Sequence, residues 1–196
     1  VIDGTGAPKF KSDIVIDKGK IIGVFPAENG DVRDPSENHF LSNFKAKHTI
    51  NGENKIISPG FIDVHTHDDD NVFLDPSMSS KISQGVTTCV AGNCGISIAP
   101  FSYKGEVPAP IALLGKSEVF RFPRVSDYKE EFNNKPSSVN LALLTGHSML
   151  RVEAMNGEFA RPATTKEISK MVDKLKLALE DGSIGLSTGL AYPAAN

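Results

Sequence analysis

Cysteine is scarce in this sequence of 196 residues, and so are long apolar runs and any excess of positive charge. Two cysteines cannot build the disulfide framework of a small secreted domain. The apolar runs are short, as at residues 111–114, whereas a helix that spans a bilayer needs about 20 such residues. Lysine and arginine total 21 against 24 acidic residues, so we predict no binding to nucleic acid and no membrane association.

The first part of the sequence has the pattern of a small β module, residues 1–57. Residues 13–24 contain two apolar runs on either side of Gly19, which predicts a hairpin. Residues 49–58 resume the strand pattern around a polar turn. Residues 26–48 are polar, which predicts an exposed loop or an insertion of unassigned role.

From residue 58 onward, strand patterns alternate with helix patterns. The predicted strands are the apolar runs over residues 61–64, 86–91, 140–144 and 183–187. The predicted helices cover residues 76–84, 126–132 and 165–181, with Asp75 and Thr164 as N-caps. This alternation predicts an α/β fold with a parallel sheet. No glycine-rich nucleotide-binding motif follows any of these strands, which argues against a nucleotide fold.

The number of strands predicts part of a barrel. A (β/α)8 barrel takes about 250 residues, and residues 58–196 hold only four predicted strands. The chain also begins with Val1 rather than methionine and ends soon after a strand pattern. We therefore expect an N-terminal fragment, in which the absence of a signal peptide says nothing about the native start.

The strongest chemical signal is the motif PGFIDVHTH over residues 59–67. Residues two apart on a strand point to one face, so His65 and His67 share a side at the C-terminal end of a predicted strand. Barrel enzymes place their active sites at that end, and two imidazoles there can bind a divalent ion. The aspartates at 68–70 could orient the imidazoles as hydrogen-bond acceptors. The alternative is a pair of ordinary polar residues.

Cys94 follows the next predicted strand, between an asparagine and a glycine. A thiolate is a good zinc ligand, whereas the usual environment of a free cysteine is a small buried apolar site. Cys89 suits that second environment better, because it lies inside the strand and on the opposite face if the strand is regular. We therefore expect no disulfide between the two.

Polar residues also follow the third and fourth predicted strands. His147 ends the third strand pattern, and Ser187 and Tyr192 lie at and beyond the end of the fourth. Each could bind substrate, although a polar residue at a strand end needs no function. A free thiol ligand suits a reducing compartment, so we expect a cytoplasmic location.

Several motifs taken together resemble the D-aminoacylase (N-acyl-D-amino-acid deacylase) family of the amidohydrolase superfamily. They are VIDGTGAP at residues 1–8, PGFIDVHTHDD at 59–69, QGVTT at 84–88, GNCGISIAP at 92–100 and GLSTGLAYP at 185–193. The resemblance covers nearly the whole chain except residues 26–48. It implies part of a small β-sandwich over residues 1–57 and the first half of a metal-dependent (β/α)8 TIM-like barrel over residues 58–196.

The resemblance implies zinc-dependent hydrolysis of the linear amide of a small-molecule substrate, an N-acyl-D-amino acid, to a carboxylate and a free D-amino acid. Cys94 matches the family's cysteine ligand to zinc, and His65 and His67 match its first-strand pair, often a second, weaker metal position. The family's remaining histidine ligands and its catalytic aspartate lie on later strands, which are absent here. The catalytic residue is thus unknown, and we expect the fragment alone to be inactive.

Two other functions share part of this pattern. Cyclic amidohydrolases of the dihydroorotase or hydantoinase type commonly bridge two metals with a carboxylated lysine on the fourth strand, and residues 183–187 contain no lysine. A non-catalytic metal-binding module would close a structural zinc site with four protein ligands, whereas three candidates are visible here. Neither alternative is as well supported as the deacylase.

Overall fold

A computed structural model describes residues 1–26, 45–109, 111–158 and 160–193 of the chain. The chain divides into two compact units, Val1–Pro59 and Gly60–Asn196. Most of the predicted polar loop at residues 26–48 lies outside the described residues. Nowhere in the described part is there a helix long and apolar enough to cross a membrane.

The first unit contains the predicted hairpin. β1 (Ser12–Asp17) and β2 (Lys20–Pro26) pair antiparallel. Lys18 and Gly19 join them with positive φ angles of 48° and 73°, as a tight hairpin turn requires. The predicted strands within residues 49–58 do not form. That segment turns at a polar bend, and its Ile57 carbonyl accepts one hydrogen bond from the Ile2 amide (2.8 Å) in place of a strand ladder.

The second unit is an α/β fold with parallel strands at its centre. β3 (Phe61–Asp63), β4 (Val86–Ala91) and β7 (Asn140–Leu143) form one sheet in that order, and all its pairs are parallel. β8 (Thr145–Gly146) follows β7 after Leu144 and pairs in parallel with β9 (Leu186–Ser187). Parallel neighbours place their C-terminal ends at one edge, so the polar residues after β3 and β4 meet there.

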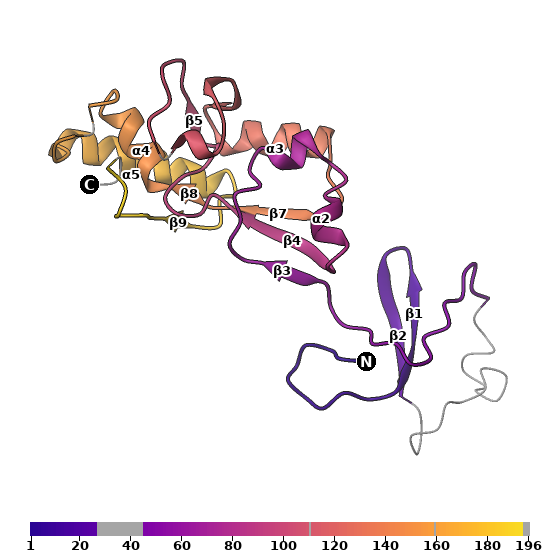
Figure 1. Cartoon of the computed structure of the whole chain (residues 1–196). Coiled ribbons are helices and arrows are strands. Elements are labelled where there is room, and N and C mark those ends of the chain that lie inside the picture. The colour runs from indigo at the N-terminus through magenta and orange to yellow at the C-terminus, as the bar shows by residue number, and fades with distance from the viewer. Residues whose placement is uncertain (27–44, 110, 159, 194–196) are drawn as a thin grey trace. The chain divides into compact units, whose positions relative to one another are not determined.

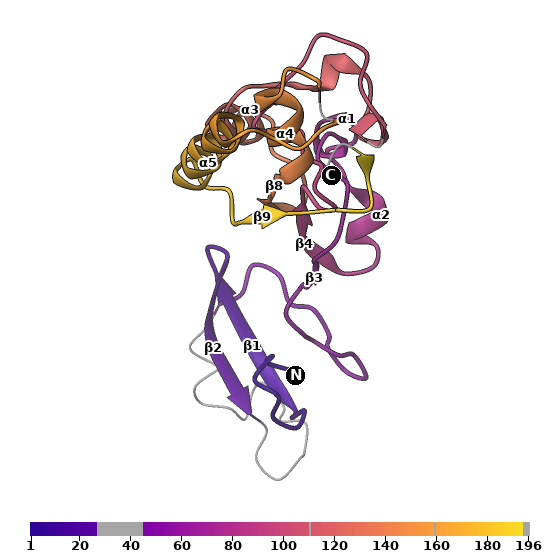
Figure 2. The ribbon, with the colours of Figure 1, turned by 90° about the vertical axis from the view of Figure 1, so that its left-hand side faces the viewer.

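The three longer helices lie on one side of these strands, as both views show (Figures 1 and 2). They are α3 (Val125–Asn134), α4 (His147–Ala154) and α5 (Thr165–Glu180). α5 begins at the predicted capping box, in which the Thr164 hydroxyl accepts from the Glu167 amide. α4 was not predicted: His147 begins this helix instead of ending a strand.

The helix predicted over residues 76–84 begins later than predicted, at Ser79. Two short helices, α1 (Asn71–Leu74) and α2 (Ser79–Ile82), occupy this part of the chain. Met78 lies between them with a φ of 44°, and a residue in the left-handed region interrupts a right-handed helix. Asp75 ends α1 rather than capping a longer helix.

The remaining elements lie between β4 and α3. A short antiparallel pair, β5 (Phe101–Ser102) and β6 (Arg121–Phe122), encloses two 3-10 turns, Ile111–Leu113 and Ser117–Val119.

The core of the second unit lies around these strands and the helices beside them. Cys89 is fully buried in it, and both cysteines are free, which confirms that they form no disulfide. The predicted apolar face of α5 is buried only in part. Met171 is buried on that face, whereas Ile168 and Leu179 are 48% and 45% exposed.

Candidate metal centre

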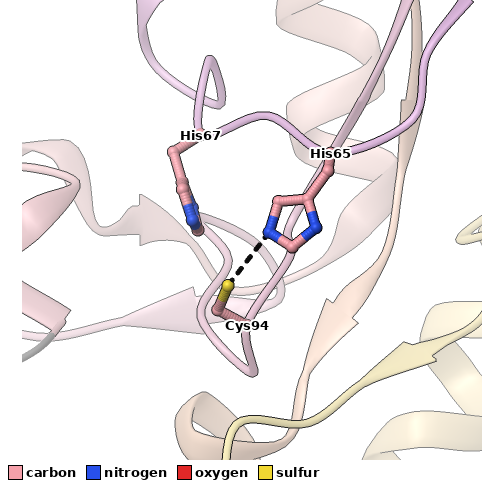
Figure 3. Close-up of side chains that lie close together, drawn as sticks. All are labelled: His65, His67 and Cys94. Carbon is pink, nitrogen blue, oxygen red and sulfur yellow. Dashed lines mark hydrogen bonds between the residues drawn. The ribbon is translucent and has the colours of Figure 1, made fainter.

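Three donor side chains meet at the C-terminal edge of the parallel strands. His65 and His67 follow β3, and Cys94 follows the neighbouring strand β4. Their nitrogen and sulfur donor atoms all lie within 4.8 Å of one another. The Nε2 atom of His65 lies 3.1 Å from the Sγ atom of Cys94, and Figure 3 shows the three side chains turned toward one another. Metal ligation by these three residues stays a prediction.

This donor set fits a zinc ion in its chemistry, and its spread is close to what one ion requires. Imidazole nitrogen and thiolate sulfur are common zinc ligands, at about 2.0–2.1 Å and about 2.3 Å from the ion, so a nitrogen and a sulfur on one ion lie at most about 4.4 Å apart. The three donor atoms lie within 4.8 Å of one another, a bound slightly above that limit, so one ion held by all three would draw the donors closer together. His65 and His67 are exposed and Cys94 is half-buried, so an ion here would be open to small molecules.

His67 is suited to act as a neutral ligand at neutral pH. Although the residue as a whole is exposed, partial burial lowers the pKa of its imidazole, and the nearby charge of His65 lowers it further, against the opposing charge of Asp68. An imidazole binds metal only in its neutral form. The two rings lie edge to face, with centroids 6.0 Å apart.

The three aspartates after His67 do not orient the imidazoles, which corrects the prediction from sequence. Among the described residues, no hydrogen bond joins any of them to His65 or His67. Asp69 is fully buried, and its carboxylate accepts from the backbone amides of Gly92 (3.3 Å) and Ile98 (3.2 Å). Burial raises the pKa of Asp69 to about 6, against the effect of these two hydrogen bonds. Asp69 therefore holds the backbone around residues 92–95, the Cys94 loop.

Lys81 of α2 supports the segment that carries the two histidines, residues 65–67, by contacting the residues that flank it. Its Nζ atom lies 2.8 Å from a carboxylate oxygen of Asp63 and 3.1 Å from one of Asp68. The other carboxylate oxygen of Asp63 accepts from the His65 backbone amide (3.3 Å). Lys81 thus holds an acidic residue on each side of the two histidines. Sequence reasoning missed this contact, because nothing in the local pattern indicates where a lysine 14 residues beyond His67 will point.

Tyr128 of α3 links the three aspartates at residues 68–70 to this helix. Its hydroxyl donates to the Asp69 carbonyl over 2.6 Å, and its ring packs against Phe73 and Phe122. Burial raises the pKa of Tyr128, with the charge of Asp69 as the next cause, so the hydroxyl keeps its proton at neutral pH.

We expect Tyr128→Phe to lower the free energy of unfolding by about 1–3 kcal/mol, because it leaves a buried carbonyl without its donor. Chemical denaturation of both proteins measures this difference. Tyr103→Phe is the matched control: the Tyr103 ring also stacks in the core, on Phe101, and it is half-buried. We expect this control to change stability by less than about 0.5 kcal/mol. Equal effects of the two substitutions would contradict an anchoring role for the Tyr128 hydroxyl.

Of the three residues predicted to contact substrate, one touches the Cys94 loop directly, and the other two lie next to residues that do, Ser148 and Gly189. His147 is half-buried and its Nδ1 atom has no hydrogen-bond partner in the described part of the chain. Burial lowers the pKa of His147, helped by the charge of Arg151. Tyr192 folds back over Gly189 through a hydrogen bond from its amide to the Gly189 carbonyl (3.1 Å). Ser187 contacts the loop directly through its hydroxyl.

Comparison with known proteins places this arrangement in a family. The model of the amidohydrolase family matches residues 48–195. A D-aminoacylase from Alcaligenes xylosoxydans xylosoxydans is 39% identical over 196 residues, which are 100% of this chain and 37% of that protein. The chain therefore spans a little over a third of the length of this relative.

Solved structures agree with the sequence comparison. A D-aminoacylase structure, described by the functional role of its binuclear metal center, superposes with a TM-score of 0.85 at 42% identity over 98% of this chain and 37% of that one. An N-acyl-D-glutamate deacylase from Bordetella bronchiseptica, complexed with zinc and a phosphonate inhibitor, gives 0.83 at 39% identity over 97% and 36%. With three quarters of its length matched by the family model, the chain belongs to the amidohydrolase family.

Proposed function

We propose that the protein to which this chain belongs hydrolyses the amide bond of N-acyl-D-amino acids, giving a carboxylate and a free D-amino acid. The observation that carries the proposal is the 39% identity to a D-aminoacylase over the whole of this chain. The three donors gathered at the edge of the strands support it, because they are a suitable part of a metal centre for a hydrolase.

The finer architecture belongs to the same proposal. The strands β3, β4 and β7 pair in parallel, and so do β8 and β9. This arrangement supports the first half of a (β/α)8 barrel. The hairpin of the first unit supports part of a β-sandwich. Both assignments stay predictions, as do the boundary at residues 57 and 58 and a cytoplasmic location.

His65, His67 and Cys94 would hold the metal, with one tight zinc position and a second, weaker one. A bound zinc ion supplies Lewis acidity, which polarises an amide carbonyl and makes hydroxide available at neutral pH. The protein's own residues keep the donors in place through the Asp69 and Lys81 contacts. A relative described by one-metal activation and second-metal attenuation supports the two positions.

A general base is still needed, and the nearby carboxylates are engaged elsewhere. Asp68 pairs with Lys81, Asp69 with two backbone amides, and Asp70 lies 3.7 Å from Arg121. We therefore infer that the base comes from outside the described residues. Contacts of His147, Ser187 and Tyr192 with the substrate stay predictions.

The test is an assay of the intact protein on N-acetyl-D-amino acids and their L counterparts. We expect release of the free D-amino acid, loss of this activity after chelation of the metal, and recovery when Zn²⁺ is restored. No metal-dependent release of a D-amino acid would contradict the proposal. Release from a cyclic amide instead would favour a cyclic amidohydrolase.

A further inference from the structure

The backbone around Cys94 adopts a conformation that needs support from elsewhere in the fold. Cys94 has a φ of 57°, and its neighbours Gly92 and Gly95 have φ angles of 79° and 78°. The left-handed region costs a residue other than glycine about 1–2 kcal/mol. Such a conformation persists only where surrounding contacts hold it.

One side chain joins the two ends of this short loop. The Ser187 hydroxyl donates to the Gly92 carbonyl over 2.5 Å and accepts from the Gly95 amide over 3.0 Å. Ser187 lies on β9, more than 90 residues away in the sequence. Its single hydroxyl therefore connects the residue two before Cys94 to the residue directly after it, and fixes the distance between them.

The chain that follows Ser187 packs closely on the same loop. A Cβ atom on Gly189 would lie 2.2 Å from the Cys94 carbonyl oxygen, and one on Gly95 would lie 2.9 Å from the Gly189 amide nitrogen. Residues 187–189 and the Cys94 loop are thus in direct backbone contact. On the other side, Asp69 holds the Gly92 amide. The direction of the Cys94 thiol is set by both contacts.

We propose that Ser187 is a positioning residue that holds the Cys94 thiol toward His65 and His67. This inference rests on the proposed function, in which Cys94 binds the metal. A contact of Ser187 with substrate is a different role: the hydroxyl hydrogen is already used in the bond to the Gly92 carbonyl. Loss of the hydroxyl would free the loop and weaken the bond between sulfur and metal.

Cobalt(II) is the probe for this role, because a thiolate bound to cobalt gives a charge-transfer absorption band in the near ultraviolet. The intact protein is stripped of metal and titrated with Co²⁺ alone, and the affinity and the band intensity per bound ion are recorded. We expect Ser187→Ala to lower the affinity by about 10–100-fold, the range for residues that orient metal ligands, and to weaken the band.

Two further variants separate positioning from general structure. Ser187→Thr keeps the hydroxyl, so we expect it to retain most of the affinity and the band. Thr188→Ala is the matched control, because Thr188 is the exposed neighbour of Ser187 and forms no side-chain hydrogen bond in the described structure. An affinity and band for Ser187→Ala equal to those of the wild type would overturn the inference, as would a threonine variant as weak as the alanine variant.

A measurement on the wild-type protein covers the case in which Ser187→Ala does not fold. The Gly95 amide donates to Ser187, so we expect hydrogen exchange at Gly95 to be slower than at an exposed loop amide. Exchange at the rate of an exposed amide would overturn the inference. A wild-type protein that binds Co²⁺ without the sulfur band would instead show that Cys94 is no ligand, which contradicts the metal site of the proposed function itself.

Discussion

Replacement of Cys94 by alanine is expected to lower zinc affinity by at least about 100-fold. Loss of a residue that only orients a metal ligand already lowers metal affinity by about 10–100-fold, and Cys94 is itself a predicted ligand. Its sulfur lies 3.1 Å from the Nε2 atom of His65, so the substitution removes one of three converging donors. Metal content after dialysis and competition with a chelator of known affinity measure the loss. We expect hydrolysis to fall with the metal content.

Cys89→Ala is the matched control for this experiment. Cys89 is the other free cysteine, and it is fully buried in the core, inside β4. Its replacement leaves a small cavity, so we expect a loss of about 1 kcal/mol in the free energy of unfolding and an unchanged zinc affinity. If both variants kept the full zinc content, Cys94 would be a structural residue and the three-donor site would be incorrect.

Replacement of Gly92 by alanine is expected to give the largest loss of stability among these variants. Gly92 has a φ of 79°, and a Cβ atom there would lie 2.1 Å from the Leu144 carbonyl oxygen. The left-handed conformation costs about 1–2 kcal/mol, and displacement of a packed neighbour adds about 1–3 kcal/mol. Because Gly92 lies two residues before Cys94 and its carbonyl accepts from the Ser187 hydroxyl, we also expect weaker zinc binding.

Gly157→Ala separates the two costs. Gly157 has nearly the same φ, 83°, but the nearest atom to an added Cβ is the Tyr103 hydroxyl oxygen at 3.8 Å, an ordinary contact. This control therefore carries the conformational cost without the collision. Chemical denaturation should show Gly92→Ala less stable than Gly157→Ala by about 1–3 kcal/mol. Equal stabilities would mean that the backbone beside β4 accommodates a side chain, contrary to the geometry at Leu144.

Local sequence patterns predicted much of the fold because they record short-range interactions. The hairpin at Gly19, the strand β4 and the capped start of α5 each follow from neighbours in the sequence. The predictions failed where a distant contact or an unusual dihedral angle decides the structure. Met78, with its φ of 44°, delays the start of the helix predicted over residues 76–84 to Ser79, and His147 begins a helix where the strand pattern ended.

The residue types of the predicted metal site can be read from the sequence alone: two imidazoles two residues apart after one strand, a thiol after the next, and motifs that resemble the D-aminoacylases. The side chains that support these donors are known only from contacts in the folded protein. Asp69 and Ser187 both bind the backbone of the Cys94 loop, from positions 23 and more than 90 residues away in the sequence. The physical reason is that parallel strand order joins segments distant in the chain, and a local pattern does not record it.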